Sequence, residues 1–103
     1  MGILSSLFGG GSKELQALKD NGAVVIDVRT PGEFKSGHVK GAKNYPLQNI
    51  GSKTQEIKRL NKPVILCCAS GMRSGQAKGI LKSAGIECAN GGSWTKVDRL
   101  YSN

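Results

Sequence analysis

One residue of this 103-residue chain, Cys68, stands where covalent chemistry is expected. It ends Pro63–Cys68, a continuous apolar run typical of a buried strand, and a turn and a helical pattern over Met72–Ala84 follow. A turn between strand and helix aims backbone N–H groups into a concavity, and the helix N-terminus adds partial positive charge. Such a concavity stabilises a thiolate, so Cys68 is a candidate nucleophile in a pocket that attracts anions.

The segment after the cysteine supplies the predicted pocket. Its expected substrate-binding residues are Ala69, Ser70, Gly71, Met72, Arg73 and Ser74. Their backbone amides would hold an oxyanion or a sulfur anion, and Arg73 would add a full positive charge. An inert buried cysteine at a strand end is an equally good interpretation of this segment alone, since free cysteines are commonly buried.

Alternating strand and helix patterns must position this site. The expected helices cover 12–21, 31–35, 50–60, 72–84 and 93–100, and the expected strands cover 23–28, 44–47, 63–68 and 86–89. This alternation predicts an open α/β fold, with a mostly parallel sheet flanked by helices on both faces. Ligands of such sheets bind beyond the carboxyl ends of the strands, which is where Cys68 is expected.

Residues 1–11 are expected to form a flexible tail that ends in glycines, and residues 12–103 a single domain. Within the tail, Gly2 and Ser6 match the short, degenerate pattern for N-myristoylation. No apolar run approaches the roughly 20 residues of a membrane span, so none is expected.

Charge and cysteine content narrow the classes of ligand. The net charge of +8 favours anionic ligands. The lysines are spread along the chain without interleaved stacking aromatics, so nucleic-acid binding is not expected. Three cysteines, two of them adjacent and none in a CxxC pair, argue against a disulfide framework or a zinc site. We therefore expect no metal or other cofactor, and reduced thiols indicate a cytoplasmic location.

Residues 27–42, which read DVRTPGEFKSGHVKGA, resemble the first signature of the rhodanese family, and Pro46 follows where that family usually has a proline. Residues 68–74 resemble the active-site loop of the family. Residues 91–94 resemble its second signature, a glycine pair ahead of an aromatic residue. The resemblance runs from about residue 12 onward and is to a stand-alone, single-domain rhodanese.

This resemblance implies a sulfurtransferase. Cys68 would take the outer sulfur of thiosulfate or another sulfane donor as a persulfide, and would pass it to cyanide or a thiol, the latter on a small molecule or an acceptor protein. The loop from Cys68 to Arg73 would bind through its amides, with no metal or organic cofactor. Many family members carry Arg directly after the cysteine, where this chain has Ala69. Arg73 and nearby lysines are the expected substitutes for that charge.

Three further residues are expected to support the site. Asp27 and Arg29 end the first strand, and a structural ion pair is favoured over direct polarisation of the pocket by Arg29. His38 is expected to make a structural hydrogen bond rather than act as a base, because a cysteine in a positive pocket needs none. Glu33 is expected to cap or pair locally, and Trp94 to pack the last helix.

Two other functions stay open. Counted from Cys67, the chain has the C-x5-R-S spacing of cysteine phosphatases, so a phosphatase or arsenate reductase using Cys67 is the first alternative. Adjacent strand residues point to opposite faces, and Leu66 stands where the phosphatase signature has His, which favours Cys68. Cys67 and Cys88 are then core residues. A non-catalytic module that carries sulfur or binds a partner is the second alternative.

Overall fold

The two β-branched, apolar runs form the central strands of a parallel sheet in the computed structural model, which describes residues 11–102. β1 (Val24–Asp27) pairs with β3 (Val64–Cys68), while β2 (Lys43–Asn44) and β4 (Cys88–Ser93) flank them. The order is β2-β1-β3-β4, and every pairing is parallel. The prediction of an open, parallel α/β sheet is confirmed.

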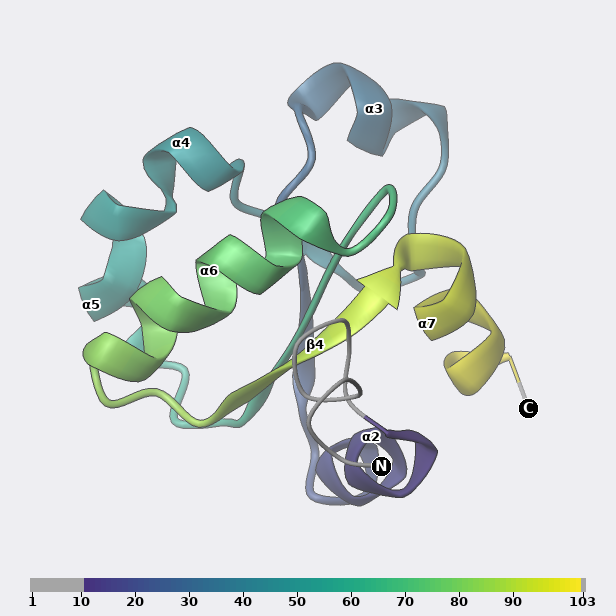
Figure 1. Cartoon of the computed structure of the whole chain (residues 1–103), viewed down its shortest axis with the longest axis horizontal. Coiled ribbons are helices and arrows are strands. Elements are labelled where there is room, and N and C mark those ends of the chain that lie inside the picture. Colours follow the sequence, from purple (N-terminus) through teal and green to yellow (C-terminus); the bar gives the residue numbers. More distant parts are fainter. Residues whose placement is uncertain (1–10, 103) are drawn as a thin grey trace.

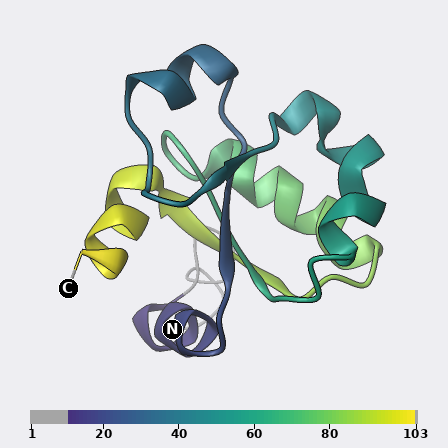
Figure 2. The same cartoon turned by 180° about the vertical axis from the view of Figure 1, so that it is seen from behind.

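Helices cover both faces of this sheet (Figures 1 and 2). One face carries α2 (Ser12–Asp20) and α7 (Trp94–Tyr101). The other carries α4 (Leu47–Ile50), the 3-10 turn η1 (Gly51–Lys53), α5 (Thr54–Lys58) and α6 (Met72–Ser83). The short helix α3 (Pro31–Ser36) lies beyond the carboxyl end of β1, where a capping box between Thr30 and Glu33 fixes its start.

Strand alternation divides the apolar core into two clusters, one on each face of the sheet. Ile26, Leu66 and Cys68 pack on the face that α6 covers, whereas Ile65 and Cys67 pack against α2 and α7. All five residues are buried. The prediction that the two adjacent cysteines face opposite sides of the sheet is confirmed, because successive side chains of a strand alternate.

The region between β2 and β3 differs from its prediction. The expected strand 44–47 is cut short at Asn44, because Pro46 lacks an N–H for the ladder and instead becomes the N-cap of α4. The expected helix 50–60 is broken into α4, η1 and α5, with the tighter turn beginning at Gly51, a residue with low helix propensity. In α6, Ala77 and Leu81 are buried as expected, but Ile80 is exposed.

The last strand contains the largest difference from the predicted elements. Gly91 and Gly92, expected to form a turn after a strand at 86–89, lie inside β4, beside a shift of register against β3. A Cβ on Gly91 would lie 2.6 Å from Val97 Cγ2 and 3.0 Å from the Leu66 oxygen, and Gly92 has φ +88°. The glycine pair therefore permits close packing and a bulge rather than a reversal.

The predicted flexible tail and its myristoylation pattern lie outside the described residues, apart from Gly11, the N-cap of α2. Between residues 11 and 102, no helix combines the length and the apolar character that crossing a membrane requires.

Two glycine substitutions test this packing. Gly91→Ala is expected to lower the free energy of unfolding by about 1–3 kcal/mol, because its methyl group overlaps Val97 and the Leu66 carbonyl. Gly79→Ala, in an open position of α6, is the matched control and is expected to raise the free energy of unfolding by up to about 1 kcal/mol. Urea unfolding measures both. Equal effects would contradict the assignment of a packed strand to the glycine pair.

Candidate functional site

The sulfur of Cys68 lies at the carboxyl end of β3, directly below the turn that starts α6. Gly71 makes this turn with φ 106°, a left-handed conformation that favours glycine. Ala69, Ser70 and Met72 are exposed on the turn, whereas Cys68, Gly71 and Ser74 are buried beneath it. The turn thus covers the sulfur and directs its backbone inward.

Four donors surround the Cys68 sulfur, and we call them the sulfur cradle: the backbone N–H groups of Ser70, Gly71 and Ser74, and the Ser74 hydroxyl. The distances to Sγ are 3.0 Å from Gly71 N, 3.4 Å from Ser74 N and 3.3 Å from Ser74 Oγ. Burial raises the pKa of Cys68, but the Ser74 hydroxyl and the three backbone donors together bring that pKa below its ordinary value. This geometry suits a thiolate.

Arg73 does not point a free charge at this sulfur. Its guanidinium binds both carboxylate oxygens of Glu33, at 2.8 and 3.0 Å, across 40 residues of sequence. The hydrogen bond from Arg73, followed by that from Thr30 N, lowers the pKa of Glu33 to about 2, so the pair persists at neutral pH. The prediction that Glu33 caps α3 is confirmed, but its pairing is not local. The expectation that Arg73 supplies positive charge to the site stays a prediction, and in the structure that charge is paired with Glu33.

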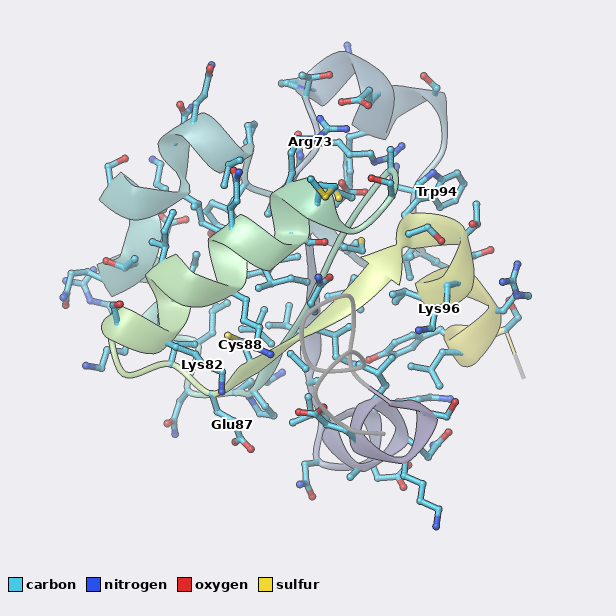
Figure 3. All side chains as sticks on the ribbon, viewed as in Figure 1. Arg73, Lys82, Glu87, Cys88, Trp94 and Lys96 are labelled. Atoms are coloured by element: carbon cyan, nitrogen blue, oxygen red, sulfur yellow. The ribbon has the colours of Figure 1, made fainter. Side chains whose placement is uncertain are left out.

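Arg29 and Asp27 form the expected structural ion pair. Both are buried, and Arg29 Nη2 lies 2.7 Å from Asp27 Oδ2. The same Nη2 donates to the Gly37 carbonyl at 2.7 Å, and the guanidinium carbon lies 4.9 Å from the centre of the Trp94 ring. The pair therefore ties together the end of β1, the segment after α3 and the start of α7. Arg73 and Trp94 lie at this same end of the molecule (Figure 3).

His38 has the structural contact that its sequence position predicts. Its Nδ1 lies 2.7 Å from the Phe34 carbonyl oxygen, which can only accept, so Nδ1 donates. Its ring stacks on that of Phe34, with the centroids 3.7 Å apart and the planes within 9°. The contacts of His38 are therefore with α3.

The other two cysteines have surroundings that favour the neutral thiol. Burial and the Asp27 carboxylate raise the pKa of Cys67, partly offset by Arg29. Burial raises the pKa of Cys88, whose sulfur lies 3.7 Å from the Lys78 carbonyl oxygen and away from the end that carries Arg73 (Figure 3). In the part of the chain that the structure describes, no three His, Cys, Asp or Glu side chains cluster as metal ligands would.

Asn90, on β4, joins the site although sequence reasoning did not select it. It is buried, accepts from Ser74 Oγ at 2.7 Å and donates from Nδ2 to the Gly71 carbonyl at 2.9 Å. A Cβ on Gly75 would lie 3.3 Å from this Nδ2, so a glycine there leaves room for the amide. The only signal in the sequence is the position of Asn90 directly before the glycine pair.

A cavity of about 320 Å³ opens beside Arg73, between the starts of α3 and α4. Val28, Pro31, Pro46 and Leu47 provide its apolar lining. Arg73 is the residue that this cavity shares with the segment after Cys68.

Comparisons with known proteins agree on the type of domain. The family model described as "Rhodanese-like domain" matches residues 12–97. Among solved structures, a rhodanese with anions from E. coli superposes with a TM-score of 0.65 at 34% identity, covering 72% of this chain and 89% of that one. The reduced CoADR-RHD of Bacillus anthracis gives a TM-score of 0.69 at 31% identity, covering 84% of this chain and 15% of that one.

Curated relatives include proteins with and without an assigned activity. The uncharacterized protein YqhL of Bacillus subtilis is 46% identical over 61% of this chain and 49% of its own length. The thiosulfate sulfurtransferase GlpE of Pseudomonas fluorescens is 37% identical over 69% of this chain and 64% of its own length. The thiosulfate sulfurtransferase PspE of Escherichia coli is 39% identical over 64% of this chain and 67% of its own length. The chain thus spans about half of the first of these relatives and about two thirds of the other two.

The sulfur cradle predicts selective reactivity. Cys68 is expected to react with iodoacetamide at a pH below that of an ordinary thiol, while Cys67 and Cys88 stay unmodified in the folded protein. Ser74→Ala is expected to move the midpoint of the Cys68 reaction upward by about one pH unit, since one hydrogen bond to the anion is lost. Peptide mass mapping across pH gives both results. A midpoint at or above the ordinary thiol pKa would contradict the cradle.

Proposed function

The chain belongs to the rhodanese-like domain family, and we propose that it is a sulfurtransferase whose nucleophile is Cys68. The observation that carries this proposal is the sulfur cradle, which holds the Cys68 sulfur with four donors and lowers its pKa. A buried structural cysteine has no need of such donors, because its neutral thiol is the form that burial favours.

In the first step, the Cys68 thiolate attacks the outer sulfur of a sulfane donor. With thiosulfate, the sulfur–sulfur bond of the donor breaks, sulfite leaves with the bonding electron pair, and a Cys68 persulfide anion forms. In the second step, cyanide or a thiolate attacks the outer persulfide sulfur, which departs as thiocyanate or a new persulfide and returns the Cys68 thiolate. This covalent route predicts ping-pong kinetics. The backbone donors of the cradle hold negative charge at each stage.

Thiosulfate or a related sulfane compound is the proposed donor. Two relatives carry thiosulfate sulfurtransferase in their names, and the net charge of +8 would attract such anions. The acceptor is cyanide or a thiol, on a small molecule or on a protein. Within the turn, Ala69 is uncharged and Arg73 is paired with Glu33, so anion binding at the sulfur depends on the backbone N–H groups.

The geometry favours neither a phosphatase or arsenate reductase that uses Cys67 nor a module that only binds a partner. Cys67 faces α2 and α7, on the opposite side of the sheet from the cradle, and the Asp27 carboxylate beside it opposes ionisation. A phosphatase or arsenate reductase using Cys67 therefore lacks the activated thiolate that its mechanism needs. A module that only binds a partner has no use for the donors around Cys68, whereas a non-catalytic sulfur carrier would use the same donors and differs from the enzyme in showing no turnover.

Intact mass spectrometry tests the nucleophile. After thiosulfate treatment, the reduced protein and its Cys67→Ser variant are expected to gain one sulfur atom, which cyanide removes, whereas Cys68→Ser gains none. A sulfur atom that persists on Cys68→Ser would overturn the assignment. If thiosulfate leaves no sulfur on any form, organic persulfides are the next donors, and failure of those as well would reject the sulfurtransferase. Aryl phosphate hydrolysis, lost in Cys67→Ser alone, would favour the phosphatase.

A charge placed after the cysteine tests how the donor is held. Ala69→Arg is expected to raise kcat/KM for thiosulfate about tenfold, because a charge-assisted hydrogen bond contributes about 1.5 kcal/mol or more. Ala69→Gln, of similar length but uncharged, is the matched control and is expected to change kcat/KM much less. Position 69 is exposed, so both variants should fold. Equal values for the two variants would show that a full charge at this position does not assist the donor.

A further inference from the structure

The Ser74 hydroxyl has one proton and two acceptors within reach. Its oxygen lies 3.3 Å from the Cys68 sulfur and 2.7 Å from Asn90 Oδ1. Ser74, Asn90 and Cys68 are all fully buried. Because one O–H group can make only one strong hydrogen bond, the sulfur and the amide oxygen must compete for it.

The orientation of the Asn90 amide follows from two backbone groups. Gly92 N–H donates to one end at 2.9 Å, which must therefore be the oxygen. The other end donates to the Gly71 carbonyl at 2.9 Å and must be the nitrogen. The atom that faces Ser74 is thus an oxygen without a proton, so a short contact with it requires Ser74 to donate.

The direction of the Ser74 hydroxyl should depend on the state of the sulfur. When Cys68 is a thiol, its S–H can donate to Ser74 Oγ, and the hydroxyl can donate onward to Asn90. When the thiol proton has left to solvent, a hydroxyl still directed at Asn90 would turn its lone pairs toward the sulfur anion. Rotation toward the sulfur removes this repulsion, and Asn90 Oδ1 then keeps only the Gly92 N–H.

We propose that Asn90 is a positioning residue that competes with Cys68 for the hydrogen bond of the Ser74 hydroxyl. The hydroxyl donates to Asn90 when Cys68 is a thiol and to the sulfur when Cys68 is a thiolate. No covalent bond of Ser74 or Asn90 breaks in this exchange, because the hydroxyl only rotates. Asn90 therefore weakens the stabilisation of the thiolate by Ser74. The backbone donors of the cradle do not depend on this competition.

Charged and titratable groups near the sulfur come from four elements, namely β3, α6, α3 and β1, and act independently of Asn90. They are Cys67 of β3, Arg73 of α6 in its pair with Glu33, and Asp27 with Arg29 at the end of β1. The hydrogen bonds that the structure describes for Asn90 join it to neutral groups: the Ser74 hydroxyl, Gly92 N–H and the Gly71 carbonyl. An effect of Asn90 on the sulfur must therefore pass through Ser74 or through the shape of the turn.

The direction of one pKa change separates these two routes. Asn90→Ala frees the Ser74 hydroxyl for the sulfur, so the midpoint of Cys68 alkylation by iodoacetamide is expected to fall by up to about one pH unit, or tenfold in thiolate fraction. If Asn90 instead only holds the turn through the Gly71 carbonyl, its loss would disorder the backbone donors and raise the midpoint. A rise, or no change, would overturn the proposal.

A double-mutant cycle adds the control. In a Ser74→Ala background, Asn90→Ala is expected to produce no further fall, whereas an equal fall in both backgrounds would contradict the route through Ser74. Should Asn90→Ala fail to fold, Asn90→Asp serves as the variant of matched shape. Its carboxylate binds the hydroxyl more strongly and is expected to raise the midpoint more in the wild-type background than in Ser74→Ala. An equal rise in both would count against the proposal.

The readout is alkylation of the free thiol, so it does not depend on any sulfur donor. The proposal about Asn90 can therefore fail while the proposed sulfurtransferase activity stands, and the sulfurtransferase proposal can fail while the role of Asn90 stands.

Discussion

The proposed function requires negative charge on a sulfur that is buried at the end of a strand, and the proposed site depends on resolving that conflict. Burial alone would keep Cys68 neutral, as it does for Cys67 and Cys88. The compensation comes from N–H groups that have no partner at the start of a helix and can therefore turn toward the sulfur. Gly71 makes this possible, because its left-handed backbone lets the chain fold back over the sulfur within three residues.

The turn over the sulfur has hydrogen-bond partners on two sides. Glu33 holds it through Arg73, and the same carboxylate caps α3. Asn90, on the neighbouring strand β4, donates a hydrogen bond to the Gly71 carbonyl of the turn. The first sequence signature, residues 27–42, thus contacts the turn through Glu33, whereas the second contact comes from Asn90, which directly precedes the glycine pair of the second signature.

Local signals in the sequence were sufficient for the elements that build the site. The apolar runs gave β1 and β3, and strand alternation separated Cys67 from Cys68 without any tertiary information. The same signals failed where a local pattern has two meanings: Gly91 and Gly92 suggest a turn, but they lie in a strand that packs too closely for a side chain. The pairing of Arg73 with Glu33 and the contact of Asn90 with Ser74 join residues 40 and 16 positions apart. A single sequence carries no direct signal for such contacts.

Hydrogen bonds rather than a free cation hold the sulfur, and this suits the proposed two-step chemistry. The negative charge lies on Cys68 in the thiolate and moves to the outer sulfur in the persulfide, so it must leave the inner position without a large loss. A full charge fixed at the inner sulfur would stabilise the resting thiolate as well as the transition state, so it would speed the transfer less than a charge that binds the donor. Backbone N–H groups and a hydroxyl can stabilise the charge at the inner or at the outer sulfur. Once the charge has moved outward, the Ser74 hydroxyl can donate to Asn90 instead. The ion pair between Arg73 and Glu33 fits this arrangement, because the arginine then helps to shape the turn while the backbone dipoles hold the anion.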